Sequence, residues 1–239
     1  DTNNITIGRN GSNINGAAAD QLISIKNSAV TLVYVDGTQG WKATDTSSLN
    51  DITLQPSYIT ATGGTITCSG DYKIHTFTGP GTFTVCSVGN AAGSNSVDYL
   101  IVAGGGGGAG AVDNGSGAGA GGGFRTSAST YSGPPLAVAC GVIVTAQGYP
   151  IVVGGGGPGG PGGLNSGTIG VSSSALSLTS TGGGFGSRYN IAGGNGGSGG
   201  GAGENSTTGG SGNTPPVSPP QGNNGGASAG CVAPGPGRG

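Results

Sequence analysis

The sequence has very little charge. Only nine acidic and seven basic residues occur among 239, with a formal net charge of −2, whereas about a quarter of the residues of an ordinary soluble protein are charged. The seven basic residues are scattered along the chain. Because nucleic acids and anionic membranes are recognised by clustered positive charge, we expect neither as a partner.

Groups that could carry catalysis are equally scarce. His75 is the only histidine, and no Gly-x-Ser-x-Gly motif accompanies it, so a Ser-His-Asp arrangement is not indicated. The acids are too thinly spread for a glycosidase-like carboxylate pair or a calcium loop, and zinc ligands are too few. A formal dinucleotide motif at Gly117, Gly119 and Gly122 lacks the helix and the acid that it needs. We therefore predict no enzymatic activity, no metal and no cofactor.

The sequence also lacks long apolar runs and helical periodicity. No run approaches the roughly 20 apolar residues of a membrane-spanning helix, and no signal sequence opens the chain. The chain begins at Asp1 and contains no Met, which suggests a segment of a longer protein.

Four cysteines, Cys68, Cys86, Cys140 and Cys231, fit no zinc or Cys-x-x-Cys spacing. They are either thiols or members of two disulfides with three alternative connectivities. If bridges form, Cys68 and Cys86 are the favoured pair, because both end strand-like runs. That pairing requires Cα atoms within about 7 Å.

Glycine is present in great excess, with 59 residues. Only 12 of them lie in residues 1–103, and the other 47 lie in residues 104–239, which hold five of the 16 charges. Disorder is one interpretation of the second part, since glycine loses much entropy on ordering. Apolar residues such as Ile151 and Leu164 interrupt the tracts, where linkers have Glu, Lys and Gln, so we favour an ordered fold.

Three regions follow from these patterns. Residues 1–62 contain β-branched runs bounded by Asn, Gly or Asp, at Asn4–Ile7, Leu22–Ile25 and Ala29–Val35, which predict strands. Residues 63–103 predict hairpins, with Gly79-Pro80-Gly81 as the turn between strands 72–78 and 82–88. Residues 104–239 form a glycine-rich distal domain. A unit of about 60 residues has a marginal core, so we expect oligomerisation.

The glycine tracts keep no Gly-X-Y register, which argues against collagen. Glycine strands in the polyproline-II conformation can approach closely and bond laterally, which would satisfy their backbone groups. Pro158 and Pro161 fit this conformation, particularly where the missing N–H would face solvent. The predicted fold class is all-β with polyproline-II/polyglycine-II-like strands in an elongated fibre module with no substantial helix.

Large aromatic and cationic side chains are few in the glycine-rich part. Such groups either anchor a bundle internally or contact a carbohydrate or protein receptor. The candidate receptor contacts are Phe124, Arg125, Tyr131, Phe185, Arg188 and Tyr189, and Tyr149 belongs to the same chemical set.

Several segments resemble glycine-rich modules in tail-fibre and other virion proteins of marine bacteriophages, especially cyanophages. They are the hairpin-like Tyr72–Val85, the strand and glycine tract Val97–Gly108, the Pro-rich Gly209–Asn223, and the β-module features Ile5–Ile14 and Val33–Trp41. The design is also similar to phage adhesin tips in which packed polyglycine helices display loops. The resemblance implies a homotrimeric fibre on the virion surface that contacts other fibre or baseplate proteins and a host polysaccharide or outer-membrane protein.

Two other classes remain open. The chain could be a purely structural decoration, neck or head fibre, or a subunit of an extracellular filament. An ice-binding protein can also use glycine-rich polyproline-II bundles.

Overall fold

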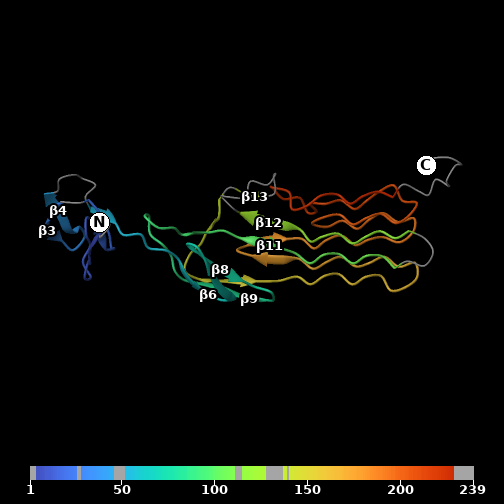
Figure 1. The fold of residues 1–239 in the computed structure, drawn as a ribbon, viewed down its shortest axis with the longest axis horizontal. Coiled ribbons are helices and arrows are strands. Elements are labelled where there is room, and N and C mark those ends of the chain that lie inside the picture. Colours follow the sequence, from blue (N-terminus) through green and yellow to red (C-terminus); the bar gives the residue numbers. More distant parts are fainter. Residues whose placement is uncertain are drawn as a thin grey trace. The chain divides into compact units, whose positions relative to one another are not determined.

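A computed structural model describes residues 4–25, 28–45, 52–110, 115–127, 137–138 and 140–228. The chain divides into two compact units (Figure 1), Asp1–Thr60 with Cys86–Asn95, and Ala61–Val85 with Ser96–Gly239. Residues 86–95 therefore group with the N-terminal unit rather than with the rest of the expected 63–103 region. No helix occurs in the described ranges, and none of them could provide a membrane-spanning helix.

The N-terminal unit consists of two small antiparallel sheets. One has the order β1 (Ile5–Ile7), β2 (Gln21–Ile23), β5 (Ile52–Leu54), and the other pairs β3 (Thr31–Asp36) with β4 (Gly40–Asp45). The carboxylate of Asp36 accepts hydrogen bonds from the backbone N–H groups of Thr38 and Gln39 and so fixes the turn between β3 and β4. The predicted strands of this region are confirmed.

This unit has almost no core of its own. Ile14, with 1% of its surface exposed, is the buried large apolar residue among its described positions. Val33, Tyr34 and Val35 of β3 are consecutive and all exposed, and Trp41 of β4 is exposed beside Tyr34, with ring centroids 5.5 Å apart. Since successive side chains of a strand point to opposite faces, the β3–β4 ribbon presents apolar groups on both faces.

The second unit begins with short strands that do not pair as the sequence predicted. β8 (Tyr72–Thr76) pairs with β7 (Thr65–Ser69), whereas β9 (Gly81–Ser87) lies between β15 (Gly148–Ile151) and β6 (Thr60–Thr62). The expected pairing of strands 72–78 and 82–88 across Gly79-Pro80-Gly81 is wrong. The turn Gly70-Asp71 closes a tight hairpin before residue 72, and β15 occupies an edge of β9.

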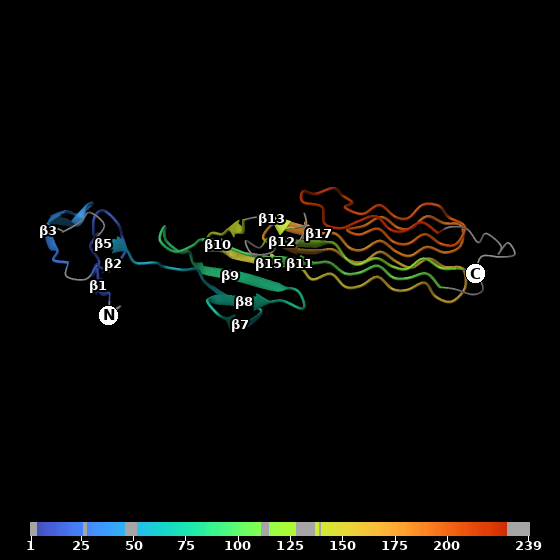
Figure 2. The ribbon, with the colours of Figure 1, turned by 45° about the horizontal axis from the view of Figure 1, so that its top comes forward.

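The remaining strands surround the beginning of the glycine tracts. They are β10 (Ser96–Val97) with β14 (Val142–Ile143), the sheet of β11 (Leu100–Val102), β12 (Phe124–Ser127) and β13 (Ala137–Val138), and the hairpin of β16 (Ser173–Ala175) and β17 (Leu178–Ser180). Extended segments run on from these strands side by side, as Figures 1 and 2 show.

The extended segments form what we call the glycine lattice. They are residues 103–110, 115–123, 154–163, 165–172, 181–188, 191–197, 198–204, 208–213 and 222–228. Segment 103–110 shows the pattern, because its residues 103, 106 and 109 donate backbone hydrogen bonds to segment 115–123, and residues 104, 107 and 110 donate to segment 165–172. Segments 154–163 and 181–188 donate to it in turn. A repeat of three residues with lateral bonds in several directions is polyglycine-II packing, so the predicted fold is confirmed.

Close approach explains why the lattice requires glycine. A Cβ added at Gly107 would lie 1.9 Å from the carbonyl oxygen of Pro158, and one at Gly104 would lie 1.9 Å from that of Gly155. Pro158 and Pro161 are exposed, while Gly157 and Gly160 beside them donate to Gly105 and Gly108. The prolines therefore occupy positions that face solvent, where a missing N–H is tolerated.

Gln221 holds the end of the lattice that adjoins the strands. Its side chain is 1% exposed, accepts a hydrogen bond from the N–H of Thr181 and donates one to the carbonyl of Pro215. Its backbone carbonyl accepts from the N–H of Phe124. The Pro-rich segment is thus a well-bonded loop that connects two lattice segments.

Candidate functional site

The lattice segments end together in a set of turns, which we call the tip. It comprises residues 161–166, the turn 188–191 and the turn 203–206. The backbone pairing places them at one end, because Gly110 bonds Asn165, Ser187 bonds Gly201, and Glu204 bonds Gly115. The tip therefore brings together residues from distant parts of the sequence.

Two of these turns have the same construction. Ile191 donates to the carbonyl of Arg188, and Ser206 donates to that of Gly203. The third residue of each turn, Asn190 or Asn205, has a positive φ of 59° or 65°, a conformation that Asn tolerates better than most residues. The backbone positions of Tyr189 and Glu204, the second residue of each turn, are thereby set relative to the lattice.

Hydrogen bonds also connect the turns to one another. The N–H of Asn190 donates to the carbonyl of Glu204 at 2.7 Å, and the N–H of Arg188 donates to the hydroxyl of Ser166 at 3.1 Å. The carboxylate of Glu204 accepts from the N–H of Gly115. The tip is consequently a connected surface rather than a group of independent loops.

The structure separates the predicted contact residues. Arg188 and Tyr189 lie in the tip, where Arg188 is exposed and Tyr189 is 37% exposed. Phe124 and Arg125 lie on β12 at the opposite end of the lattice, where the Arg125 guanidinium donates to the carbonyl of Thr179. About six residues of each lattice segment separate the tip from the end that adjoins the strands. At a rise of about 3.1 Å per residue, the two ends are about 20 Å apart.

The other candidates lie elsewhere. Phe185 is a half-buried lattice residue whose ring packs against Gly194, where an added Cβ would lie 2.4 Å from the ring. Tyr149 lies on β15 with its ring 6.5 Å from that of Phe83. Hydrogen bonds with Gln147 and Thr145 hold the pKa of Tyr149 below its usual value. Tyr131 lies outside the described residues.

Sequence reasoning missed part of the tip. Leu164 and Ile191 are exposed there, and Asn165 donates side-chain hydrogen bonds to the carbonyls of Pro161 and Gly162. The available signal was the recurrence of Asn where one glycine-rich segment ends and the next begins, at Asn165, Asn190 and Asn205. Asn in such a context indicates a turn, and Asn190 and Asn205 do have a positive φ, whereas in the turn at Asn165 the positive φ is at Gly163.

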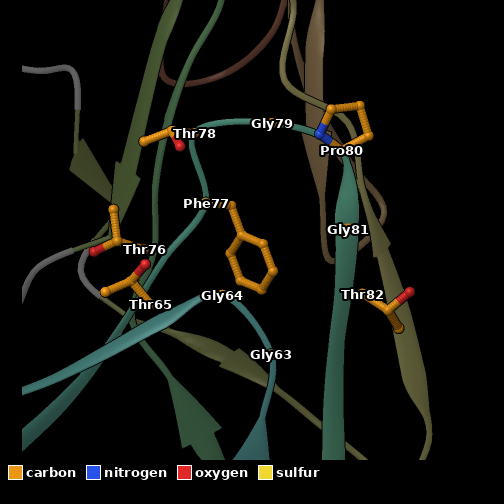
Figure 3. A pocket seen from close by; sticks show the side chains of 10 residues that line it. All are labelled: Gly63, Gly64, Thr65, Thr76, Phe77, Thr78, Gly79, Pro80, Gly81 and Thr82. Carbon is orange, nitrogen blue, oxygen red and sulfur yellow. The ribbon is translucent and has the colours of Figure 1, made fainter.

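A pocket of about 380 Å³ lies in the loop between β8 and β9. Figure 3 shows the ring of Phe77 pointing into this loop, toward Gly64 and Gly63, with Pro80 at the outer turn. Nearby, His75 Nδ1 lies 2.8 Å from the carbonyl oxygen of Gly63, and its ring packs edge-on against Phe83 at 5.1 Å. These contacts are those of a structural histidine.

Cys68 on β7 and Cys140 before β14 are exposed thiols, so the favoured Cys68–Cys86 bridge is not formed in this structure. Cys86 is exposed on β9, and Cys231 lies outside the described residues. Within the described ranges, no group of three or more His, Cys, Asp or Glu side chains is arranged to hold a metal ion.

Comparison with known proteins places the lattice in a family. The sequence pattern of the glycine-rich domain family matches residues 76–239. That is more than half of the chain, which therefore belongs to this family. No curated protein and no solved structure matches the chain.

Proposed function

We propose that the chain is an adhesive outer part of a bacteriophage fibre, in which the tip of the glycine lattice contacts a receptor on the host surface. The receptor would be a surface polysaccharide or an outer-membrane protein. The observation that carries the proposal is the connected tip, which exposes an aromatic, a guanidinium and aliphatic groups at the end of a hydrogen-bonded lattice. The sequence resemblance to phage fibre modules supports the viral setting.

The lattice suits display of a binding surface. Side-chain and loop ordering is a substantial cost of association, and the turns of the tip are already held by backbone hydrogen bonds such as Asn190 to Glu204 and Ile191 to Arg188. Aromatic and guanidinium groups are enriched among the residues that dominate binding energy. The tip therefore combines suitable side-chain chemistry with a backbone that is held by hydrogen bonds.

The poor core of the N-terminal unit supports association of several copies, which we propose to be three. A unit that buries Ile14 and exposes Val33, Tyr34, Val35 and Trp41 gains little from burial as a monomer. Packing the β3–β4 ribbons of separate copies together would cover both apolar faces. Several copies would also present several tips, which raises the avidity for a repetitive host surface.

Sedimentation equilibrium of the purified chain is expected to give three times the mass of one chain. A variant with Val33→Glu and Val35→Glu places two charges on one face of the ribbon and is expected to shift the population to monomers. Ile143→Glu, at a still more exposed apolar position on β14, is the control and is expected to keep the mass of the original protein. A monomeric original chain would contradict the association.

The adhesive function predicts that the purified chain blocks phage adsorption to the host. The double variant Arg188→Ala and Tyr189→Ala is expected to reduce this inhibition at least about tenfold, because it removes two large exposed groups of the tip. Arg125→Ala, at the opposite end of the lattice, serves as the control and is expected to inhibit like the original chain. Absence of any inhibition would favour a purely structural fibre, in which the lattice acts as a spacer.

A further inference from the structure

We propose that the glycine lattice binds an extended glycine-rich strand of another polypeptide beside segments 103–110 and 154–163, which we call the central and the edge segment. The strand would take the next place in the lattice, which we call the open position. This position lies along the lattice and not at the tip, so the proposal is independent of the receptor binding proposed for the tip.

Four segments are bonded to the central segment, and they surround it in an unbroken series. Segments 115–123 and 165–172 both donate backbone hydrogen bonds to segment 181–188, and segment 165–172 also donates to the edge segment. A strand with three residues per turn has three rows of N–H groups and three rows of carbonyls, which allows six neighbours. Two adjacent places that no described segment fills therefore remain between the edge segment and segment 115–123. The open position is the place next to the edge segment.

The central segment supplies the donors of the open position. In order around the series, it donates to its first neighbour, accepts from the second, donates to the third and accepts from the edge segment. The next row in this alternation is a donor row, which consists of the N–H groups of Gly105 and Gly108. Within the described ranges these two N–H groups donate no hydrogen bond, and both residues are half-buried.

The edge segment supplies the acceptors. The carbonyls of Gly157 and Gly160 accept no backbone hydrogen bond from the described part of the chain, although the N–H groups of these residues donate to the central segment. An added Cβ at Gly107 of the central segment would lie 1.9 Å from the carbonyl oxygen of Pro158 and 2.8 Å from that of Gly157. Because the Pro158 carbonyl bonds segment 165–172 on one side of the central segment, the alternation places the Gly157 carbonyl on the other side, at the open position.

The border of the open position is free of side chains. At Gly156 and Gly159, both exposed, an added Cβ would have a carbonyl oxygen of the central segment as its nearest neighbour, at 3.6 Å. At Gly157 and Gly160 it would lie 2.0 and 2.3 Å from carbonyl oxygens of segment 165–172. Packing within the chain therefore requires glycine at the second pair but not at the first, where close approach of a further strand would require it.

The open position fits an uncharged backbone in the polyproline-II conformation. The central and edge segments consist only of Gly, Ala and Pro, so they contribute no charged side chain. Their donors and acceptors repeat every three residues, or about 9 Å, whereas the groups on one side of a β-strand repeat about every 7 Å. Pro158 and Pro161 interrupt a different row of the edge segment, the one that includes Gly155, and leave these donors and acceptors in place.

The small area of the open position favours a single strand over a second folded copy. A strand as long as the central segment is about 25 Å long, and two lattice segments together are about 10 Å wide. The contact would thus cover about 250 Å² of the lattice, roughly a third of the 800 Å² that each partner buries in a stable protein–protein interface. Main-chain hydrogen bonds would supply the affinity, as they do when a peptide adds a strand to a β-sheet.

NMR titration of the full purified chain with a synthetic peptide tests the proposal. The peptide contains Gly-Pro-Gly repeats between terminal lysines, because proline at every third position fixes φ and leaves the other positions without side chains. The amides of Gly105 and Gly108 are expected to shift and to exchange at least about tenfold more slowly with this peptide, and to stay unchanged with a peptide that has Ala in place of each Gly. Unchanged exchange with the glycine peptide would overturn the proposal. Slow exchange of both amides in the chain alone would do so as well, because it would show that the chain itself or a second copy already fills the position.

Alanine substitutions along the edge segment separate peptide binding from folding. Gly156→Ala and Gly159→Ala each place a methyl group at the open position, and each is expected to weaken peptide binding at least about fivefold without lowering the thermal midpoint. Gly155→Ala is the matched control, since Gly155 is exposed and has no atom within 4 Å of an added Cβ, and it should bind like the original chain. Binding by both variants as tight as by the control would refute the site.

Discussion

Replacing Gly184 by Ala is expected to lower the thermal midpoint of the glycine lattice by about 10 °C. Gly184 is buried, and an added Cβ would lie 1.9 Å from the carbonyl oxygen of Gly194 and 2.7 Å from the N–H nitrogen of Gly200. Neighbouring segments would have to separate, which breaks lateral hydrogen bonds on both sides. We expect a loss of about 3 kcal/mol or more, which corresponds to about 10 °C for a domain of this size.

Gly121→Ala is the matched control for this substitution. Gly121 belongs to segment 115–123, is exposed, and has no atom within 4 Å of an added Cβ. Because Ala has fewer accessible unfolded conformations than Gly, the variant is expected to be as stable as the original or up to about 1 kcal/mol more stable. Calorimetry on the original chain and the two variants measures the thermal midpoints. Equal midpoints for Gly184→Ala and Gly121→Ala would contradict the close packing of the glycine lattice.

Hydrogen exchange is expected to alternate along segment 154–163 with the period of the lattice. The amides of Gly157 and Gly160 donate to the carbonyls of Gly105 and Gly108, both at 2.8 Å. Gly156 and Gly159 are exposed, and within the described part of the chain their amides donate no backbone bond. Since exchange requires the bond to open, we expect Gly157 and Gly160 to exchange about 100-fold or more slowly than their neighbours.

The measurement has an internal comparison, because all four residues are glycines within one short segment. Residue-resolved NMR exchange would record the pattern. Uniform exchange at the rates of an unfolded chain would show that the segment is a flexible linker, as its composition alone also allowed.

The sequence was sufficient for the type of packing but not for its arrangement. Short β-branched runs bounded by turn residues predicted strands such as β1 and β3, and Pro158 and Pro161 were consistent with the polyproline-II conformation of the glycine segments. The order of the lattice segments could not be predicted, because one glycine backbone offers the same donors and acceptors as another. The prediction of the strand that pairs with β9 failed for a related reason, since its actual partner β15 lies more than 60 residues further along the chain.

The same limitation applies to the candidate site. Phe124-Arg125 and Arg188-Tyr189 are similar pairs in similar sequence surroundings, and composition does not distinguish them. Their difference in position comes from the direction of the segments to which they are attached. The first pair follows a segment that runs toward the strands, and the second begins at the last residue of a segment that runs toward the tip.

The two exposed prolines of segment 154–163 have a consequence for growth of the lattice. Polyglycine-II packing has bonding directions around each strand, so a glycine bundle has no inherent limit to its width. At Pro158 and Pro161 the chain offers the solvent a pyrrolidine ring in place of a donor, much as proline protects the edges of β-sheets from further pairing. The two prolines thereby oppose the addition of a further glycine strand at this face of the lattice.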